Sequence, residues 1–226
     1  MSAGTASAAE RGGFAELADE PAGDVRVVES EELVHGRVWD IRRDRFAFGD
    51  TELVRDYMDH PGAVAVLAVD DDDRVLMFRQ YRHAIAHRDW ELPAGLMDMP
   101  GESGLEGAER ELAEEADLRA DHWALLLELF LSPGGSSEAV RVFLARGLSP
   151  AAEHGFVRDG EEAELAPEWV PLDEAVEAAL SGRIANSLTV SAVLAAEAAR
   201  ARGWATLRDP HALWTARDAV RGERSR

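Results

Sequence analysis

Three glutamates, Glu111, Glu114 and Glu115, are spaced at i, i+3 and i+4 within the segment 105–116. If this segment is a helix, the three carboxylates share one face. Like charges on one face repel each other, and a divalent cation with oxygen ligands, such as Mg²⁺, offsets that repulsion. The spacing alone leaves two interpretations open, a metal site and an acidic helix face exposed to solvent.

The residues that flank the glutamates favour the metal site. From Gly95 the chain reads GLMDMPGESGLEGAERELAEEADL, in which Glu102 is followed after seven residues by the run Arg110 to Leu118. This segment resembles the Nudix box, G-x5-E-x7-R-E-U-x-E-E-x-G-U, where U is apolar. The matching positions are Glu102, Arg110, Glu111, Leu112, Glu114, Glu115 and Leu118.

The segment departs from the box at two positions. Gly95 lies seven residues before Glu102 instead of six, so the intervening loop holds one extra residue. Asp117 replaces the closing glycine at a position that ends the helix and needs a left-handed backbone, which Asp tolerates better than most residues. Because the extra residue lies in the loop, away from the acidic helix, we expect the metal geometry to survive.

The resemblance implies a role for each box residue. Glu111 and Glu115 ligate Mg²⁺ (or Mn²⁺), and Glu114 ligates the ion or orients its ligands. A backbone carbonyl just before the box glycine often joins the metal shell in this family, and here it is that of Ala94. Glu102 and Arg110 form a salt bridge that braces the loop against the helix, so their role is structural and neither is a metal ligand.

Features beyond the helix resemble the ADP-ribose pyrophosphatase subgroup. Pro133 lies fifteen residues beyond Leu118, and the subgroup-like sequences are Trp90–Gly95 (WELPAG) and Ser132–Gly134 (SPG). The alternative for Pro133 is an ordinary turn proline. The resemblance implies Mg²⁺-dependent hydrolysis of ADP-ribose to AMP and ribose 5-phosphate. Other nucleoside diphosphate derivatives (GDP-mannose, flavin adenine dinucleotide) and a non-catalytic ADP-ribose sensor that regulates transcription are the alternatives.

A further glutamate, Glu138, follows Pro133 in the sequence GGSSE. In this subgroup a loop glutamate at that position resembles the general base that activates the attacking water. The preceding residue, often acidic in the subgroup, is Ser137 here. The alternative is that Glu138 simply begins the next strand.

Substrate recognition is expected from arginines, an aromatic residue and one more carboxylate. Guanidinium groups suit phosphate oxygens, and Arg55 and Arg82 are the candidates; strand alternation places Arg79 on the face opposite to Arg82. Trp39 is the candidate for stacking on adenine, with Phe46 as its alternative, and either could be a core residue instead. Glu91 either hydrogen-bonds the terminal ribose through its carboxylate or is a strand residue with no role in binding.

The hydrophobic pattern predicts the elements that must position these residues. Short β-like runs in 25–56 predict a small antiparallel sheet, and the runs 63–69 and 74–82 predict a hairpin around an acidic turn. A helix over 105–116, strands over 123–131 and 139–145, and helices from 171 and over 187–202 follow. The fold class is therefore α+β, and the resemblance implies a Nudix α/β/α sandwich with a mixed sheet.

The chain is predicted to have four parts: a disordered tail (1–24), an N-terminal β-sheet for dimerisation and substrate recognition (25–60), the Nudix catalytic domain (61–205) and a C-terminal tail (206–226). Relatives in the subgroup are homodimers that exchange their N-terminal sheets, so a homodimer is expected. A small sheet is marginal on its own, which fits that arrangement.

Composition narrows the partners. The net charge of −20, with 44 acidic and 24 basic residues, disfavours nucleic acid and anionic membranes as partners. The chain has no cysteine, which excludes disulfides, zinc–thiolate sites and a thiol nucleophile. No run of about 18 apolar residues predicts a membrane span. We therefore expect a cytoplasmic enzyme that acts on a small nucleotide-sugar.

Overall fold

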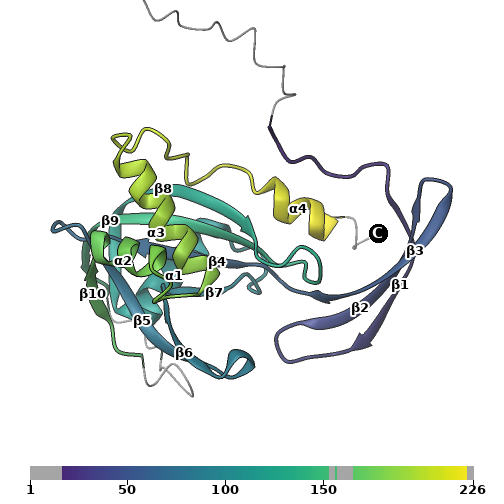
Figure 1. Cartoon of the computed structure of the whole chain (residues 1–226), viewed down its shortest axis with the longest axis horizontal. Helices are drawn as coiled ribbons and strands as arrows, with labels where there is room; N and C mark the ends of the chain where they lie inside the picture. The colour runs from purple at the N-terminus through teal and green to yellow at the C-terminus, as the bar shows by residue number, and fades with distance from the viewer. Residues whose placement is uncertain (1–16, 153–155, 157–164, 223–226) are drawn as a thin grey trace, which may run out of the picture.

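A computed structural model describes residues 17–152, 156 and 165–222. The tail expected over 1–24 falls mostly outside these residues. Within the described part of the chain, no helix combines the length and the apolar character that a membrane span needs. The chain folds into an N-terminal sheet and a larger body of two sheets and three helices, and a C-terminal segment packs against that body (Figure 1).

The N-terminal sheet is antiparallel, in the order β1-β2-β3. Its strands are β1 (Arg26–Val34), β2 (Asp40–Phe48) and β3 (Thr51–Asp59). Charged pairs such as Arg43–Asp56 and Arg45–Glu29 lie side by side across these strands. Figure 1 shows this sheet standing away from the body, with β3 leading into it.

The body contains two sheets. One is mixed, because β4 pairs in parallel with β9 and antiparallel with β7. Its strands, in sheet order, are β7 (Ala94–Leu96), β4 (Ala63–Ala68), β9 (Ala139–Pro150) and β8 (Leu118–Phe130). The other sheet is antiparallel and consists of β10 (Glu168–Pro171), β5 (Arg74–Arg82) and β6 (His87–Glu91), with a 3-10 turn, η2 (His83–Ile85), between β5 and β6.

The hairpin predicted for 63–69 and 74–82 is wrong beyond its turn. Only Val69 and Val75 are bridged, after which β4 and β5 enter different sheets. The reason is that both strands are buried on both faces, so each is a central strand with two other partners. The turn itself is as expected, with the Asp70 carboxylate accepting hydrogen bonds from the backbone of Asp72 and Arg74.

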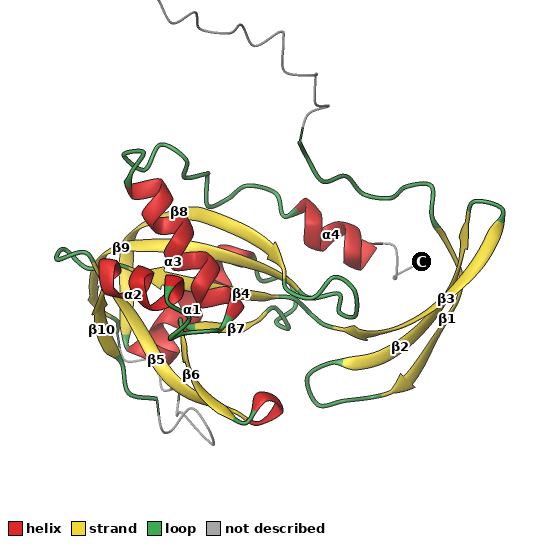
Figure 2. Ribbon diagram, viewed as in Figure 1, coloured by secondary structure: helices red, strands yellow, loops and turns green. Residues whose placement is uncertain are grey.

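Alternate residues of β4 build two separate cores. Val64, Val66 and Ala68 pack with the helix α1 (Gly104–Ala116). Ala65 and Leu67 pack on the other face with α2 (Leu172–Leu180) and α3 (Ser187–Arg200). The expected α+β sandwich with a mixed sheet is therefore confirmed, with helices on both sides of the strands (Figure 2).

Local chemistry determines where α1 begins and ends. Ser103 caps the first turn: its hydroxyl accepts from Glu106 N, and the Glu106 carboxylate accepts from Ser103 N. At the other end, Asp117 has φ 56° and ψ 32°, the left-handed conformation expected at this position. After Asp117 the chain reverses direction and enters β8, so it returns from α1 to the sheet.

The C-terminal segment packs on the body. Leu125 and Arg208 exchange two backbone hydrogen bonds, both 3.0 Å, and Trp214 is 8% exposed within the core beneath α1. A short helix, α4 (Thr215–Gly222), follows within the segment expected to be a C-terminal tail. The C-terminal segment thus contributes to the hydrophobic core.

Candidate active site

The acidic face of α1 lies against β7. Glu111 and Glu115 are each 8% exposed, and the Glu115 carboxylate accepts a hydrogen bond of 3.0 Å from the backbone N–H of Ala94. The carboxylate of Glu111 fills the space where a side chain at Gly95 would stand, so a Cβ there would overlap it. Gly95 therefore provides the close approach between strand and helix, although one extra residue separates it from Glu102.

The extra residue is accommodated in an exposed turn. Met97 is 4% exposed and belongs to the core beneath α1, whereas residues 98–101 are exposed. Gly101 has φ +82°, which only glycine adopts without strain. The turn carries the added length away from the helix, as expected from the position of the extra residue in the loop.

Arg110 gathers three carboxylates. Its guanidinium donates to Glu102 at 2.8 and 3.1 Å, to Glu111 at 2.5 Å and to Glu114 at 3.1 Å. The hydrogen bond to Glu102, together with the charge and hydrogen bond of Glu111, raises the pKa of Arg110 above its usual value against the opposing effect of burial. The expected ion pair with Glu102 is present, and Arg110 also offsets the repulsion between Glu111 and Glu114.

The donor atoms of the α1 face fit a divalent cation. Glu111, Glu114 and Glu115 offer carboxylate oxygens, and Ala94 offers a carbonyl oxygen; these are the hard ligands that Mg²⁺ takes. Two of these carboxylates are buried beside a backbone that approaches closely only because Gly95 lacks a side chain. A cation would offset the negative charge of these three glutamates, which Arg110 balances only in part.

The oxygens of these glutamates do not converge on a single point. Among the described residues, the acidic and histidine side chains whose ligand atoms all lie within 4.8 Å of one another are Glu32, His35 and Asp40, at the turn between β1 and β2. There the His35 ring contacts Asp40 at 2.9 Å. On α1, Glu111 and Glu114 share the Nη1 atom of Arg110, whereas the Glu115 carboxylate accepts from the Ala94 N–H.

Glu138 comes directly before β9, at the same end of the sheet as the last residue of β7. In the register of the sheet, Ala63 lies opposite both Val140 and Leu96, so the chain before β9 and the chain after β7 meet at one edge. The Glu138 side chain is 23% exposed, and burial raises the pKa of its carboxyl. A carboxylate with a raised pKa accepts a proton more readily, which suits a general base.

Arg82 and Glu91, both expected to bind substrate, bind each other. The guanidinium of Arg82 makes a two-pronged contact with the Glu91 carboxylate, at 2.7 and 2.6 Å. Burial raises the pKa of Glu91, against the opposing effect of Arg82. The charge of Glu115 contributes to the raised pKa of Arg82, so this pair lies within electrostatic reach of the α1 face.

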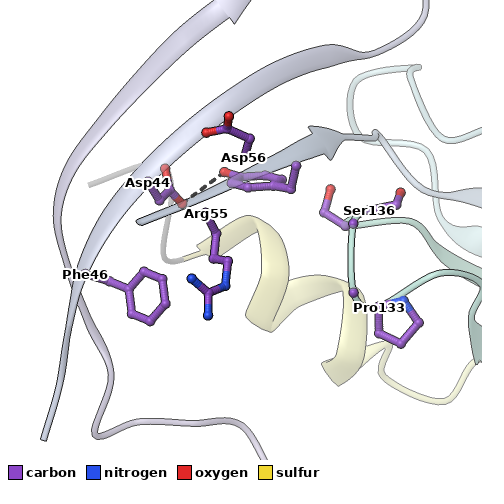
Figure 3. Close-up of a pocket in the computed structure, with 10 residues that line it drawn as sticks. Asp44, Phe46, Arg55, Asp56, Pro133 and Ser136 are labelled. Atoms are coloured by element: carbon purple, nitrogen blue, oxygen red, sulfur yellow. Dashed lines mark hydrogen bonds between the residues drawn. The ribbon is translucent and has the colours of Figure 1, made fainter. Parts of the chain in front are cut away.

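Arg55 lines a pocket of about 370 Å³ between the N-terminal sheet and the loop that holds Pro133. Figure 3 shows its guanidinium extending between the ring of Phe46 and Pro133. Asp44 and Tyr57 also line the pocket and are hydrogen-bonded to each other at 3.0 Å. The pocket thus combines an aromatic face with a cation.

Trp39, the first choice for stacking on adenine, lies elsewhere. It stands in the turn between β1 and β2, is 40% exposed and is absent from the lining of this pocket. Phe46, its predicted alternative, lines the pocket beside Arg55. Arg79 stacks its guanidinium over the ring of Trp90, 5.6 Å from the centroid, so it is engaged on its own strand pair.

Two residues near Glu138 were missed in the sequence. His60, for which the sequence predicts no role, is 8% exposed, and its Nε2 lies 3.9 Å from the Glu138 carboxylate. Ser137, noted only for replacing an acidic residue, is also 8% exposed and hydrogen-bonds to the chain around His60. A histidine between a strand and a Pro-Gly pair was the available signal, but nothing local shows what it faces.

Comparison with known proteins identifies relatives of this chain. Residues 59–189 match the family model described as NUDIX domain. An ADP-ribose pyrophosphatase of Mycobacterium tuberculosis is 42% identical over 180 residues, which cover 77% of this chain and 84% of that protein. An ADP-ribose pyrophosphatase of Bacillus subtilis is 32% identical over 174 residues, covering 74% and 90%. The crystal structure of an ADP compounds hydrolase shares the fold, with a TM-score of 0.65 at 24% identity, over 79% of this chain and 96% of that one.

Proposed function

The chain belongs to the NUDIX family, and from this premise we propose that it hydrolyses ADP-ribose to AMP and ribose 5-phosphate. The observation that carries the proposal is the burial of Glu111 and Glu115 against Ala94 and Gly95, in a chain that resembles ADP-ribose pyrophosphatases well beyond the box. That arrangement offers hard oxygen ligands for a cation, and the pocket that Arg55 lines supports the proposal as a place for the rest of the nucleotide.

The cofactor in this proposal is Mg²⁺ or Mn²⁺. Glu111, Glu114, Glu115 and the Ala94 carbonyl would hold the cation. When bound, it would supply charge neutralisation for the diphosphate oxygens and for the leaving phosphate. Glu102 and Arg110 would keep the helix and the box loop in register, since their ion pair joins the two.

Glu138 is the proposed general base. A water oxygen forms a bond to one phosphorus of the diphosphate while the bond from that phosphorus to the bridging oxygen breaks. Glu138 takes the proton that the water loses, and the bridging oxygen leaves on the other phosphate. The raised pKa of Glu138, caused by burial, supports this role because it makes the carboxylate a stronger base.

Substrate recognition is proposed for two groups of residues. Arg55, with Phe46 beside it, would bind the nucleotide end in the pocket between the N-terminal sheet and the Pro133 loop. Arg82 and Glu91 would bind near the metal face, where Glu91 is suited to a ribose hydroxyl and Arg82 to a phosphate. Trp39 remains a stacking candidate only if another copy of the chain brings it to a site.

A homodimer that shares its N-terminal sheets is part of the proposal. The sheet exposes large apolar side chains, which a second copy would cover. These side chains are Val27, Leu33, Val34, Phe48 and Val54 of the strands, and Val38 and Trp39 in the turn between β1 and β2. Light scattering on the purified chain tests this: a monomer at micromolar concentration would rule out a shared site. The absence of cysteine is compatible with the cytoplasm, the compartment we propose.

The test of the activity is product analysis with Mg²⁺ for the wild type, Glu115→Gln and Glu138→Gln. We expect AMP and ribose 5-phosphate from the wild type, with the rate lowered about 10²–10⁴-fold in Glu138→Gln and at least about 100-fold in Glu115→Gln. Glu109→Gln is the matched control, because it removes an exposed carboxylate from the same helix. Full turnover by Glu115→Gln would refute the metal face.

A substrate panel separates the alternatives. GDP-mannose and flavin adenine dinucleotide are assayed beside ADP-ribose, and a higher kcat/KM on either would reassign the substrate while keeping the chemistry. Binding of ADP-ribose with no turnover under any divalent cation would instead indicate a sensor, which a DNA gel-shift would then test for regulation of transcription.

A further inference from the structure

The loop that carries Glu138 is bonded to the end of β3. Met58 N donates to Gly135 O at 2.9 Å, and Ser137 N donates to Met58 O at 2.9 Å, so Met58 and Ser136 form a short parallel bridge. β3 belongs to the N-terminal sheet and also carries Arg55. The backbone just before Glu138 is therefore held by a strand of the N-terminal sheet.

Ser137 reinforces this attachment with its side chain. Its hydroxyl accepts from the backbone N–H of His60 at 2.9 Å and donates to the carboxylate of Asp59 at 3.1 Å. The residue is 8% exposed, and a buried hydroxyl needs such partners to offset its loss of water. The Ser137 side chain thus clamps the linker after β3 to the residue next to Glu138.

The ring of His60 is oriented by a backbone neighbour. Gly62 N donates to Nδ1 at 3.1 Å, so Nδ1 acts as an acceptor and the neutral ring carries its proton on Nε2. Nε2 lies 3.9 Å from the Glu138 carboxylate, and the two side chains are only 9% and 23% exposed. This separation exceeds a direct hydrogen bond, but a small shift of the carboxylate or one bridging water would make the contact.

We propose that His60 and Ser137 are positioning residues for Glu138. The Nε2–H of His60 orients the Glu138 carboxylate. The hydrogen bonds of Ser137 fix the position of the loop, so that the carboxylate lies close to that N–H. The inference rests on the proposed role of Glu138 as general base. If the inference holds, the position of Glu138 depends on β3, the strand that also carries the pocket residue Arg55.

Two substitutions of His60 separate its two nitrogens. In His60→Asn the amide oxygen replaces Nδ1 as acceptor for Gly62 N, but no group stands at the place of Nε2. In His60→Gln the amide nitrogen reaches the place of Nε2 and can donate to Glu138. We expect kcat to fall about 10–100-fold in His60→Asn, as on loss of other orienting partners, with KM nearly unchanged. His60→Gln should recover most of that loss.

Thermal unfolding of both variants controls for folding. If His60→Asn and His60→Gln unfold at similar temperatures and yet differ in kcat as described, the donor at Nε2 is responsible. Equal kcat in the two variants would overturn the proposal, because the group that faces Glu138 would then be without effect.

A double-mutant cycle ties the effect to Glu138. In the Glu138→Gln background, His60→Asn and Ser137→Ala should add little further loss of kcat, because each acts through the carboxylate that is already gone. Ser181→Ala, which removes a hydroxyl that bonds to the end of α2, is the matched control for serine. Losses of the same size in both backgrounds would overturn the positioning role.

The same cycle distinguishes the two proposals. If Glu138→Gln alone keeps full turnover, the assignment of Glu138 as base fails, and the positioning inference fails with it. If Glu138→Gln is slow but the effects of His60 and Ser137 are independent of it, the base stands and only the positioning inference is rejected.

Discussion

At the scale of single residues, space matters as much as charge. Gly95 has no catalytic group, yet its missing side chain is what lets the Glu111 carboxylate lie against β7. Arg110 likewise acts by what it touches, since it joins Glu102 of the loop to Glu111 and Glu114 of the helix. The site is therefore made of candidate ligands together with the residues that make room for them and orient them.

The substitution Gly95→Ala tests this requirement for space. The added methyl group would overlap the Glu111 carboxylate, so either the carboxylate or the strand must move. We expect a loss of about 1–3 kcal/mol in the free energy of unfolding, as for other overpacked sites. A higher Mg²⁺ concentration should also be needed for half-maximal turnover. Gly23→Ala, where a Cβ meets nothing within 4 Å, is the control; equal behaviour of the two variants would disprove the argument.

At the scale of the element, α1 presents its carboxylates correctly because both ends are defined. The Ser103–Glu106 capping box starts the helix, and the left-handed Asp117 stops it one residue before β8. A shift of either end would rotate Glu111 and Glu115 away from β7, since residues on a helix turn by about 100° each. The helix is thus held in register by chemistry outside its acidic face.

The backbone at Asp117 gives an element-scale prediction that compares Asp117→Gly with Asp117→Ala. Both variants lack the carboxylate, so their difference isolates the cost of the left-handed conformation at φ 56°. We expect Asp117→Gly to be more stable than Asp117→Ala by about 1 kcal/mol in denaturant unfolding. If the alanine variant is the more stable one, the end of α1 does not need that conformation in solution.

At the scale of the whole molecule, one charged cluster ties the C-terminal segment to the body. Arg141 of β9, whose side chain is 4% exposed, donates to Glu128 of β8 at 3.1 and 2.6 Å and to the carbonyls of Ala212 and Leu213. Arg208 adds a contact of 2.8 Å to the same carboxylate. The strands that border the site are in this way braced by a segment far along the chain.

The same segment reaches the box loop through one further arginine. Arg217 donates to the carbonyls of Pro61 and Met97, both at 3.0 Å, and lies over the ring of Trp214. Pro61 follows His60, and Met97 belongs to the loop between Gly95 and Glu102. The C-terminal segment therefore supports both backbone stretches that meet near the α1 face.

Glu128→Gln tests the charged cluster. Burial would raise the pKa of Glu128, but hydrogen bonds from Arg141 and Arg208 lower it below its usual value. We expect Glu128→Gln to lose about 1–3 kcal/mol of stability at pH 7, the range for hydrogen bonds to charged groups. The control is Glu174→Gln, whose exposed pair with Arg183 should contribute about 0–1 kcal/mol.

The pH dependence of this loss has a definite sign. Because the folded-state pKa of Glu128 is lowered, its charge stabilises the fold above the unfolded value of about 4.3 and stops doing so as the pH falls through the folded value. The stability gap between the wild type and Glu128→Gln should therefore narrow as the pH is lowered below about 4. Denaturant unfolding at pH 7 and in acid measures it; a constant gap would show that the charge is not the cause.

What the sequence by itself determined is local. Helical spacing and the fixed distances of the box placed the acidic face on a helix over 105–116, and the structure has that helix at Gly104–Ala116. The left-handed Asp117 and the strands on both sides also follow from residues that are neighbours in the chain. Such features depend on backbone preferences and hydrophobic periodicity, which a sequence carries directly.

What only the tertiary structure decided is which faces meet. The contacts of Ser137 with Asp59 and with His60 join residues 78 and 77 positions apart, and Arg217 reaches Pro61 across 156. The departure of β4 and β5 into separate sheets, and the place of Trp39 outside the pocket, belong to the same class. No local preference encodes such contacts, because they arise when buried polar groups find partners on elements that packing has brought together.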